Sequence, residues 1–478
     1  MSLKNIISTA KLLRNELHPS ASPATPYNAA SRQWFLLFGL LMIISGITHF
    51  GFLTTPDSVV FDEFHFGKFT TAYCCTGENF FDIHPPLAKL LIAGAAKLGG
   101  YQGGFDFKQI GETYRDVPVF AYRVVPAIAG FALTFILFVL IRQLGGSDAA
   151  AFFAAALYTF DNAFLVQTRF ILLDGVLLLG IFAALSAYLA AMRTEHVRQA
   201  GLLTLSGVLV GLAVGTKFTG LTALGLIMII ALVRVAQDLS AQNIFKWARS
   251  VVWVVGCAMA VYLFSWFLHF QLLDKPGYGD AFYHRTGHFF TDLLNLHHIM
   301  FSSNAAITTV DPDASPWWSW PLMTTPPFYW AGQHASIYLL GNPVVWWGTS
   351  FFLIVIACIV VLAKVTRLSW RAKTPPVTLW IPFVGYLIAT LPYVMVKRPL
   401  FMYHYLPSLL FALLYVVLWL DSAGWIRSGG VAVQRKSFFG VLAVTIACFV
   451  FLTSVTYGYP HPSWYAKALS FVFPYVTQ

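Results

Sequence analysis

The sequence predicts an all-α polytopic membrane protein with about eleven transmembrane helices and two large extracytoplasmic loops that contain interfacial helices. Hydrophobic residues make up 58% of the 478 residues and charged residues only 10%, and the mean hydropathy is +0.69. These values exclude an ordinary soluble enzyme. Uncharged stretches of about twenty residues recur, and each is long enough to cross a hydrocarbon core of about 30 Å.

The first span sets the pattern for the others. Residues Trp34–Leu53 contain no acidic or basic side chain. No A-x-A cleavage pattern follows, so this segment is expected to be a retained span and not a signal peptide. Further spans are predicted at 119–141, 149–166, 170–192, 200–215, 219–235, 250–270, 343–363, 378–396, 402–420 and 438–456.

The distribution of charge predicts the orientation. With a cytoplasmic N-terminus, 17 of the 30 Lys and Arg residues lie on the inner face, together with five of the 20 acidic residues. The formal net charge of +10 then divides into +12 inside and −2 outside. This is the positive-inside pattern, and it explains the basic balance without a nucleic-acid partner. Both long loops are then extracytoplasmic, and the expected location is the plasma membrane.

The chain is expected to form a single integral-membrane domain. Its predicted parts are a cytoplasmic segment (1–33), a first extracytoplasmic loop (54–118), a second one (271–342) and a C-terminal four-helix membrane region (343–478). Cys74 and Cys75 are adjacent in the first loop and are not expected to pair with each other. No Cys/His spacing typical of zinc appears, so no metal and no cofactor is predicted.

The first loop concentrates the ionisable residues. Asp62 and Glu63 lie about ten residues beyond the first span, close to His65 and Lys68. Charged groups next to a bilayer are costly and are usually functional. The acids also suit the N-terminus of a short helix, so a second interpretation is that they only cap a surface helix. A further helix is predicted at 87–98, after the prolines Pro85 and Pro86.

Several motifs follow one another along the chain in a recognisable order. They are Asp62-Glu63-x-His65-Phe66-Gly67-Lys68-Phe69, Phe81-Asp82-x-His84-Pro85-Pro86-Leu87-x-Lys89-Leu90, Tyr122-Arg123-Val124-Val125-Pro126, Gln167-x-Arg169-x-x-Leu172-Leu173-Asp174, Ser315-Pro316-Trp317-Trp318-Ser319-Trp320-Pro321-Leu322 and Tyr403-His404-Tyr405-Leu406-Pro407. With these motifs the chain resembles the protein O-mannosyltransferases, polytopic glycosyltransferases of GT-C type that use polyprenyl-phosphate sugars.

The resemblance implies a reaction and its partners. It implies inverting transfer of mannose from a polyprenyl-phosphate-mannose donor to Ser or Thr hydroxyls of secreted or membrane proteins. Within that reaction we assign Asp62 as the catalytic base and expect Glu63 to orient the acceptor or its partner helix. Eukaryotic members carry a β-trefoil-type domain in the second loop, which is too short here, so the chain resembles the shorter bacterial-type members. Asp311-Pro312-Asp313 stands where the family often has a histidine.

Extracytoplasmic basic residues are the candidates for binding the donor phosphate. They are Arg123, Arg169, Lys397 and Arg398. An arginine fork matches phosphate oxygens. Arg123 and Arg169 could instead pair with buried acids as structural residues, and Lys397 and Arg398 could anchor the protein at the interface.

Other residues of the motifs are expected to bind substrate or shape the site. The tryptophans of the second loop suit either sugar stacking or an interfacial aromatic belt. Adjacent carboxylates should also raise the pKa of one another, which would help a base to work near neutral pH. The residues in this group are His65, Asp82, His84, Lys89, Asp174, Trp317, Trp318, Trp320, Tyr403 and His404.

Two alternatives to this function stay open. The first keeps the donor class but transfers the sugar to a lipid or a cell-envelope glycan. The second is a secondary transporter, but the sequence shows no internal repeat and its acids gather in one loop outside a span, unlike transporters.

Overall fold

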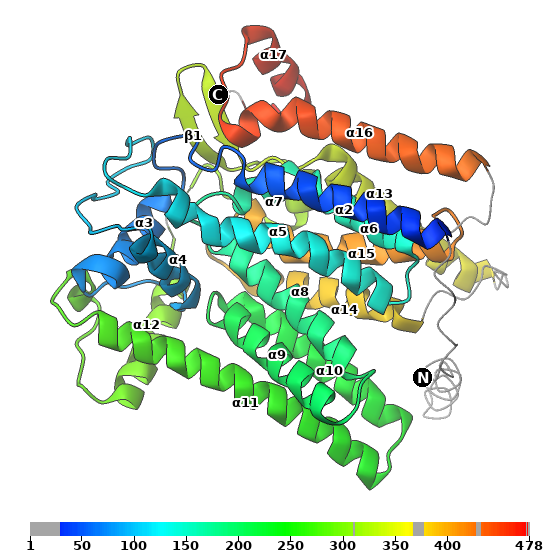
Figure 1. Ribbon diagram of the computed structural model, residues 1–478, viewed down its shortest axis with the longest axis horizontal. Coiled ribbons are helices and arrows are strands. Elements are labelled where there is room, and N and C mark those ends of the chain that lie inside the picture. Colours follow the sequence, from blue (N-terminus) through cyan, green and yellow to red (C-terminus); the bar gives the residue numbers. More distant parts are fainter. Residues whose placement is uncertain (1–28, 309–310, 367–376, 427–431, 475, 477–478) are drawn as a thin grey trace.

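The computed structural model describes residues 29–308, 311–366, 377–426, 432–474 and 476. Long helices lie side by side, and short helices and loops gather at one end of them, around α3, α4 and α12 (Figure 1). Over the described residues, nine helices are long and apolar enough to cross a membrane. They are α2 (Ala29–Phe50), α5 (Val119–Gln143), α8 (Asp174–Ala191), α9 (His196–Val214), α10 (Leu221–Gln237), α11 (Ala241–Leu272), α13 (Pro343–Thr366), α15 (Leu406–Ser422) and α16 (Ala432–Tyr457).

Two of the eleven predicted spans are shorter than expected. The segment predicted at 149–166 forms α6 (Asp148–Thr159) and α7 (Asn162–Gln167), and the one at 378–396 forms η5 (Val377–Leu379), α14 (Trp380–Thr390) and η6 (Leu391–Met395). At 1.5 Å per residue the 12 residues of α6 measure only about 18 Å. The Asp161 carboxylate explains the break, because it accepts hydrogen bonds from the backbone N–H of Phe164 and of Asn342.

The remaining elements lie between or beyond these helices. The helices predicted after Asp62 and at 87–98 are confirmed as α3 and α4, and one β-hairpin is the exception to an all-α fold in the described part of the chain. These elements are α3 (Glu63–Thr71), η1 (Ala72–Thr76), α4 (Leu87–Leu98), η2 (Phe218–Gly220), η3 (Tyr278–Ala281), α12 (Phe289–Ala305), η4 (Trp317–Leu322), β1 (Phe328–Gly332), β2 (Ala335–Tyr338), η7 (Met402–Tyr405) and α17 (Ser463–Val472).

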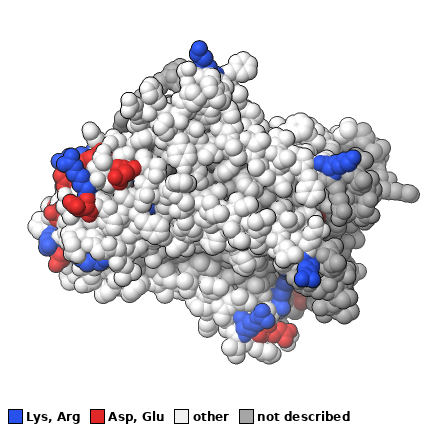
Figure 2. Space-filling view, turned by 45° about the horizontal axis from the view of Figure 1, so that its top comes forward, with Lys and Arg blue, Asp and Glu red and all other residues white. Residues whose placement is uncertain are grey.

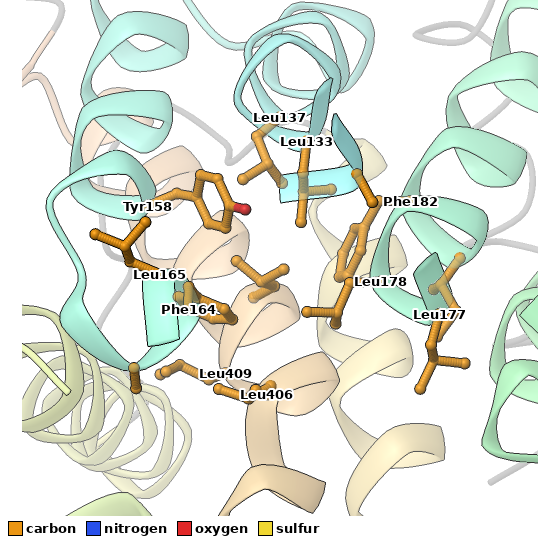
Figure 3. Packing of buried hydrophobic residues seen from close by; sticks show 14 of the residues in the cluster. Leu133, Leu137, Tyr158, Phe164, Leu165, Leu177, Leu178, Phe182, Leu406 and Leu409 are labelled. Carbon is orange, nitrogen blue, oxygen red and sulfur yellow. The ribbon is translucent and has the colours of Figure 1, made fainter. Parts of the chain in front are cut away.

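The core lies where α5, α6, α7, α8 and α15 meet. Side chains from all five helices point toward one another there, among them Leu133, Tyr158, Phe164, Phe182 and Leu409 (Figure 3). The hydroxyl of Tyr158 donates a hydrogen bond of 2.9 Å to the carbonyl of residue 130, so its one polar atom is satisfied inside the core. Close packing of this kind replaces the hydrophobic effect as the force that holds helices together in lipid.

The surface agrees with a membrane protein. Lys, Arg, Asp and Glu gather mainly at two ends of the molecule and leave a broad uncharged middle (Figure 2). The N-terminal segment of the predicted domain division lies, up to residue 28, outside the described residues. The division into 1–33, 54–118, 271–342 and 343–478 stays a prediction.

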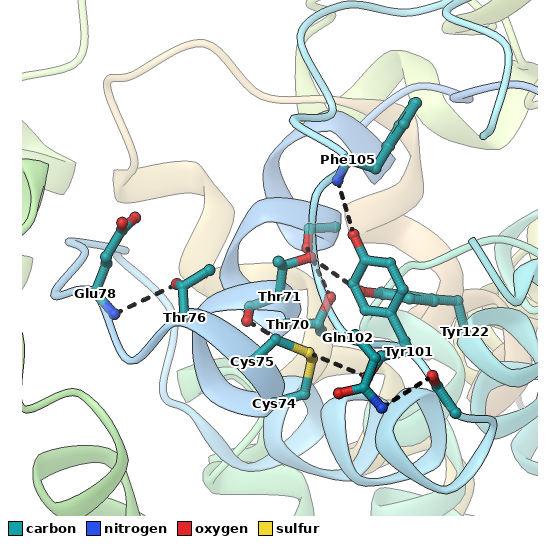
Figure 4. The surroundings of a disulfide bond; sticks show 12 residues. Thr70, Thr71, Cys74, Cys75, Thr76, Glu78, Tyr101, Gln102, Phe105 and Tyr122 are labelled. Carbon is teal, nitrogen blue, oxygen red and sulfur yellow. Dashed lines mark hydrogen bonds between the residues drawn. A yellow bond between two sulfur atoms is a disulfide. The ribbon is translucent and has the colours of Figure 1, made fainter. Parts of the chain in front are cut away.

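The expectation for the adjacent cysteines is wrong. Cys74 and Cys75 form a disulfide with each other in the π-helical turn η1. Figure 4 shows Thr71 and Tyr122, whose hydroxyl groups are 2.9 Å apart, close to this disulfide. Disulfides persist in oxidising compartments, so the pair is consistent with an extracytoplasmic first loop.

The close packing of α8 against α9 predicts that substitutions at two glycines differ in their effect on stability. A Cβ atom at Gly180 of α8 would lie 2.9 Å from the backbone nitrogen of Ala213 of α9, whereas nothing lies within 4 Å of a Cβ at the exposed Gly201 of α9. Overpacking of a core costs about 1–3 kcal/mol. Gly180→Leu should therefore lower the unfolding temperature of the detergent-solubilised protein, and Gly201→Leu should leave it unchanged. Equal unfolding temperatures for the two variants would contradict this packing.

Candidate functional site

Glu63 fixes the first loop to the transmembrane helices. Its side chain is fully buried at the start of α3. The carboxylate accepts hydrogen bonds from the backbone N–H of Val60 at 2.8 Å and of Ile171 at 2.9 Å, and from the hydroxyl of Tyr114 at 2.8 Å. Arg123 of α5 donates to both of its oxygens, each at 2.8 Å. Glu63 is therefore satisfied by the protein itself and is closed off from a substrate.

Arg123 has no donor left for a phosphate. Beyond its two bonds to Glu63, it donates to the carbonyls of Leu53, Pro56 and Ser58 at 3.0–3.1 Å. These contacts use all five N–H groups of a guanidinium. The side chain is also fully buried. The structure thus supports the structural alternative for Arg123, in which an acid and three loop carbonyls hold it.

Arg169 also donates hydrogen bonds to backbone carbonyls, at the end of α2 and in the residues that follow it. Its two terminal nitrogens donate to backbone carbonyls of residues 48, 51, 52 and 55, at distances from 2.7 to 3.5 Å. Its guanidinium carbon lies 4.0 Å from the centre of the Tyr457 ring. Burial lowers the pKa of Arg169 to about 10, which keeps it protonated at neutral pH. The structure does not place Arg169 or Arg123 where a donor phosphate could reach them, and the expected acid partner of Arg169 is replaced by carbonyls.

Asp62 is the carboxylate that stays available. It stands just before α3 and is partly exposed, and its side chain does not cap the helix. No hydrogen bond to its carboxylate is recorded over the described residues. Burial raises the pKa of Asp62 to about 7; the Lys217 ammonium lowers it, while Asp174, Asp82 and Asp311 raise it further. The raised pKa agrees with the sequence-based expectation, but its cause is burial and more distant acids, not the neighbouring Glu63.

A chain of polar side chains lies close enough to Asp62 to influence its charge. Lys217, just before η2, contacts both oxygens of Asp174 at 2.8 Å. Gln167 donates to Asp174 at 2.7 Å and accepts from the hydroxyl of Tyr329 at 2.5 Å. The Tyr329 ring in turn stacks on Phe61, the residue before Asp62, with ring centres 4.0 Å apart. The fold thus brings Asp174, which the sequence predicts as a site residue, close to Asp62.

Lys217 is a functional candidate that the sequence analysis missed. The signal was present, because Lys217 is a lone charge in the short turn between two apolar segments, 200–215 and 219–235. A charge enclosed in this way points to a site more strongly than one in a long loop. Tyr329 gave no signal, because its place beside Phe61 comes from a backbone hydrogen bond of 2.9 Å between distant loops.

Tyr403 and His404 close the site from the C-terminal half of the chain. The Lys217 ammonium lies 5.3 Å from the centre of the Tyr403 ring, and that ring lies 6.1 Å from the Phe61 ring. His404 lies next to Arg398, with 3.5 Å between its Nε2 and the Arg398 Nη2. The late motif therefore connects Lys217 with Arg398, two cations that the sequence places 181 positions apart.

Lys397 and Arg398 line an open pocket together with residues of the second loop. The pocket has a volume of about 680 Å³, and Asp311 and Trp317 line it as well. Lys397 is exposed and Arg398 is partly buried. Of the four basic residues predicted to bind the donor phosphate, these two are the ones that face open space.

The three predicted tryptophans have three different environments. Trp317 lines this open pocket, Trp318 is exposed, and Trp320 is buried against His404 with ring centres 6.0 Å apart. The position of Trp317 is therefore compatible with contact to a substrate, and the exposure of Trp318 is compatible with an interfacial aromatic belt. Trp320 instead packs against His404 and helps to hold it in place.

Asp82, His84 and Lys89 form a second group near Asp62, at the start of α4, in which Lys89 is buried and Asp82 and His84 are partly buried. The Lys89 ammonium donates to the Asp82 carboxylate and, at 2.8 Å, to the carbonyl of His84. Burial alone would raise the pKa of Asp82, but Lys89 and His84 hold it below its usual range. Burial lowers the pKa of His84 to about 3, so its ring is neutral. His65 lies exposed on α3 against Phe64 and does not join this group.

Within the described ranges, no three His, Cys, Asp or Glu side chains are arranged to hold an ion together.

Two family models match the chain. One, described as dolichyl-phosphate-mannose-protein mannosyltransferase, matches residues 39–274, and the other, the C-terminal four-transmembrane region of protein-O-mannosyltransferase, matches residues 289–472. The chain is 35% identical over 281 residues to dolichyl-phosphate-mannose--protein mannosyltransferase 4 of Candida albicans, which is 56% of this chain and 36% of that protein. It is 34% identical over 274 residues to mannosyltransferase 1 of Saccharomyces cerevisiae, 55% of this chain and 33% of that protein. The chain thus spans about a third of the length of the curated relatives it matches.

The fold is similar to that of two solved proteins. The S. cerevisiae protein O-mannosyltransferase Pmt1–Pmt2 complex bound to the sugar donor matches with a TM-score of 0.85 at 18% identity, over 92% of each chain. ArnT from Cupriavidus metallidurans bound to undecaprenyl phosphate matches with a TM-score of 0.51 at 15% identity, over 93% of this chain and 74% of that one. At these identities the likeness concerns the fold.

The buried pair of Glu63 and Arg123 predicts that substitutions of the adjacent carboxylates Glu63 and Asp62 differ in their effect on the unfolding temperature. Glu63→Gln removes the charge that Arg123 requires, and breaking a buried ion pair costs about 3–5 kcal/mol. Its unfolding temperature in detergent should therefore fall clearly below that of the native protein. Asp62→Asn is the matched control and should not fall, since its carboxylate supports no recorded contact. Equal losses in both variants would contradict the structural role of Glu63.

Proposed function

Because the chain belongs to the protein O-mannosyltransferase family, we propose that it transfers mannose from a polyprenyl-phosphate-mannose donor to Ser or Thr hydroxyls of proteins, with inversion at the anomeric carbon. The observation that carries this proposal is the contrast between two adjacent carboxylates. Glu63 is buried and bound on every side, whereas Asp62 is half-buried and has no hydrogen-bond partner on its carboxylate among the described residues, and burial raises its pKa to about 7. A group of that pKa is suited to general-base work at neutral pH.

Asp62 performs the proton transfer in this mechanism. Its carboxylate removes the proton of the acceptor hydroxyl while the hydroxyl oxygen bonds to the anomeric carbon. The bond from that carbon to the phosphate oxygen breaks on the opposite face, and its electron pair leaves with the polyprenyl phosphate. The displacement from the opposite face inverts the configuration.

Glu63 acts as a positioning residue and not as an acceptor ligand. Its bonds to Val60, Ile171 and Arg123 join α3, the loop before it, α5 and the segment before α8. This network holds the backbone of Asp62 in place. The expected role of Glu63 is orientation of the acceptor or of its partner helix, and this network supports a positioning role that acts through α3.

Lys217 and Arg398 are the cations best placed for the donor phosphate. An ammonium has three N–H groups, and Lys217 is held toward Asp174, which fixes it beside the Tyr403 ring. Arg398 lies next to His404 at the open pocket, and Lys397 adds a second positive charge there. Cations fixed in advance stabilise the charge that develops on a departing phosphate.

The reaction is proposed to take place on the extracytoplasmic side, with the N-terminus in the cytoplasm and the protein in the plasma membrane. Two observations support this orientation. The inner face would carry +12 and the outer face −2, and the loop that holds Asp62 also holds the Cys74–Cys75 disulfide.

The activity can be tested with one substitution. Purified protein is given labelled polyprenyl-phosphate mannose and a Ser/Thr-rich peptide. The native protein should label the peptide, and Asp62→Asn should lower kcat by about 10²–10⁴-fold, the usual share of a general base. Its unfolding temperature should stay equal to that of the native protein or rise, because the ionised carboxylate is the form that burial disfavours.

Three results would contradict the proposal in different ways. Full activity of Asp62→Asn would remove Asp62 from the mechanism. Label that enters lipid but not peptide would assign a different acceptor. Movement of a solute across vesicles without any sugar transfer would assign transport.

The raised pKa also predicts a pH dependence. Asp62 is a base only when ionised, so kcat/KM should rise with pH and level off above a midpoint of about 7. The exposed Asp311 raises the pKa of Asp62, so Asp311→Asn should move the midpoint to lower pH. The measurement is the peptide mannosylation rate from about pH 5 to about pH 9. A midpoint near 4 in the native protein would contradict the assignment.

A further inference from the structure

A recess lies at the end of the molecule opposite the catalytic loops. It is found where α8 ends, α9 begins and α11 starts, and Figure 1 shows this region far from α3, α4 and α12. It is a shallow surface recess with an enclosed volume of only about 20 Å³, so a ligand would lie against its mouth and not inside it. The residues that line it are Tyr188, Ala191, Met192, Gln199, Leu203, Lys246, Trp247, Arg249 and Ser250.

The recess is positively charged. Lys246 and Arg249 both line it and both are exposed, and its lining contains no carboxylate. Over the described ranges, neither residue forms an ion pair. Arg234 of α10 adds a third positive charge, because its guanidinium lies 6.0 Å from the Trp247 ring, and the Lys246 ammonium lies 5.6 Å from the same ring. Nearby acids, Glu195 and Asp238, lie outside the lining.

The wall of the recess is fixed by hydrogen bonds between helices and within α11. The hydroxyl groups of Tyr188 of α8 and Ser250 of α11 lie 3.3 Å apart, and the indole of Trp247 donates to Asn243 at 2.9 Å. Gln199 at the start of α9 donates to the carbonyl of Ala191. The two cations are thus presented by a rigid wall and not by a loose loop.

The length of α11 places this recess in the headgroup layer. Its 32 residues span about 48 Å, more than the hydrocarbon core of about 30 Å. Its first turns, with Lys246 and Arg249, therefore extend beyond the hydrocarbon. One turn further into the membrane, Val252 and Trp253 are exposed, as is Leu205 on α9. Charge at the membrane surface is thus continuous with an apolar face for acyl chains.

We propose that this recess binds the phosphate diester of an anionic phospholipid in the leaflet opposite the catalytic loops. Lys246 and Arg249 contact the phosphate oxygens, Trp247 forms the wall against which the headgroup lies, and the acyl chains lie along the exposed apolar faces of α9 and α11. Two cations without a lining acid select an anionic lipid over a zwitterionic one, whose own ammonium they would repel. This site is separate from the catalytic site and does not depend on the proposed transfer reaction.

The test compares lipid binding by three proteins. The native protein, the pocket variant Lys246→Gln/Arg249→Gln and the control variant Arg32→Gln/Arg198→Gln are purified in detergent. Arg32 and Arg198 are exposed and lie outside the recess, so the control loses the same charge. Binding of phosphatidylglycerol, phosphatidylcholine and inorganic phosphate is measured by native mass spectrometry and by the shift in unfolding temperature.

The proposal predicts a specific pattern. Phosphatidylglycerol should bind and stabilise the native and control proteins, and the pocket variant should bind it on the order of 25-fold more weakly, from about 1 kcal/mol for each charge removed. Phosphatidylcholine should stabilise all three equally. Equal binding of phosphatidylglycerol by the pocket variant and the control would overturn the site. Equal stabilisation of the native protein by inorganic phosphate would overturn the lipid as the ligand.

Discussion

The buried ion pair between Glu63 and Arg123 is the interaction on which the site depends. Burying two charges costs more than their attraction returns unless every remaining lone pair and proton is satisfied. Here five donors reach the Glu63 carboxylate, and all five N–H groups of Arg123 are used. The pair therefore joins the loop after α2, the start of α3, α5 and the segment before α8 into one unit. That unit decides where Asp62 stands.

The same pair separates two neighbouring carboxylates into different tasks. Glu63 is surrounded by donors, whereas Asp62 is partly withdrawn from water without a bonded cation, and its pKa rises to about 7. Environment, and not residue type, sets the role of each acid. The environment of each arginine likewise sets its role. Arg123 and Arg169 hold the ends of helices, which leaves Lys217 and Arg398 as the cations that face the site.

The sequence predicts those features that depend on local pattern. The apolar runs located the long helices, and the acids and prolines of the first loop located α3 and α4. The break near Asp161 could not be predicted, because it depends on a hydrogen bond from the distant Asn342. The roles of Arg123 and Arg169 could not be predicted either, since a buried arginine bound to carbonyls and an accessible one look alike in a sequence. Lys217 is visible in the sequence as a lone charge in a short turn, but its neighbours Asp174 and Tyr403 are brought to it only by the fold.

We expect Asp62 to keep its proton to near neutral pH within a framework fixed by Glu63 and Arg123. Infrared difference spectroscopy of the native protein against Asp62→Asn, recorded across a pH titration in detergent, observes this carboxyl group directly. The account predicts a protonated carboxyl band that is present in the native protein, absent in the variant and lost with a midpoint near pH 7. A band that disappears near pH 4, the ordinary value for an aspartate, would contradict it.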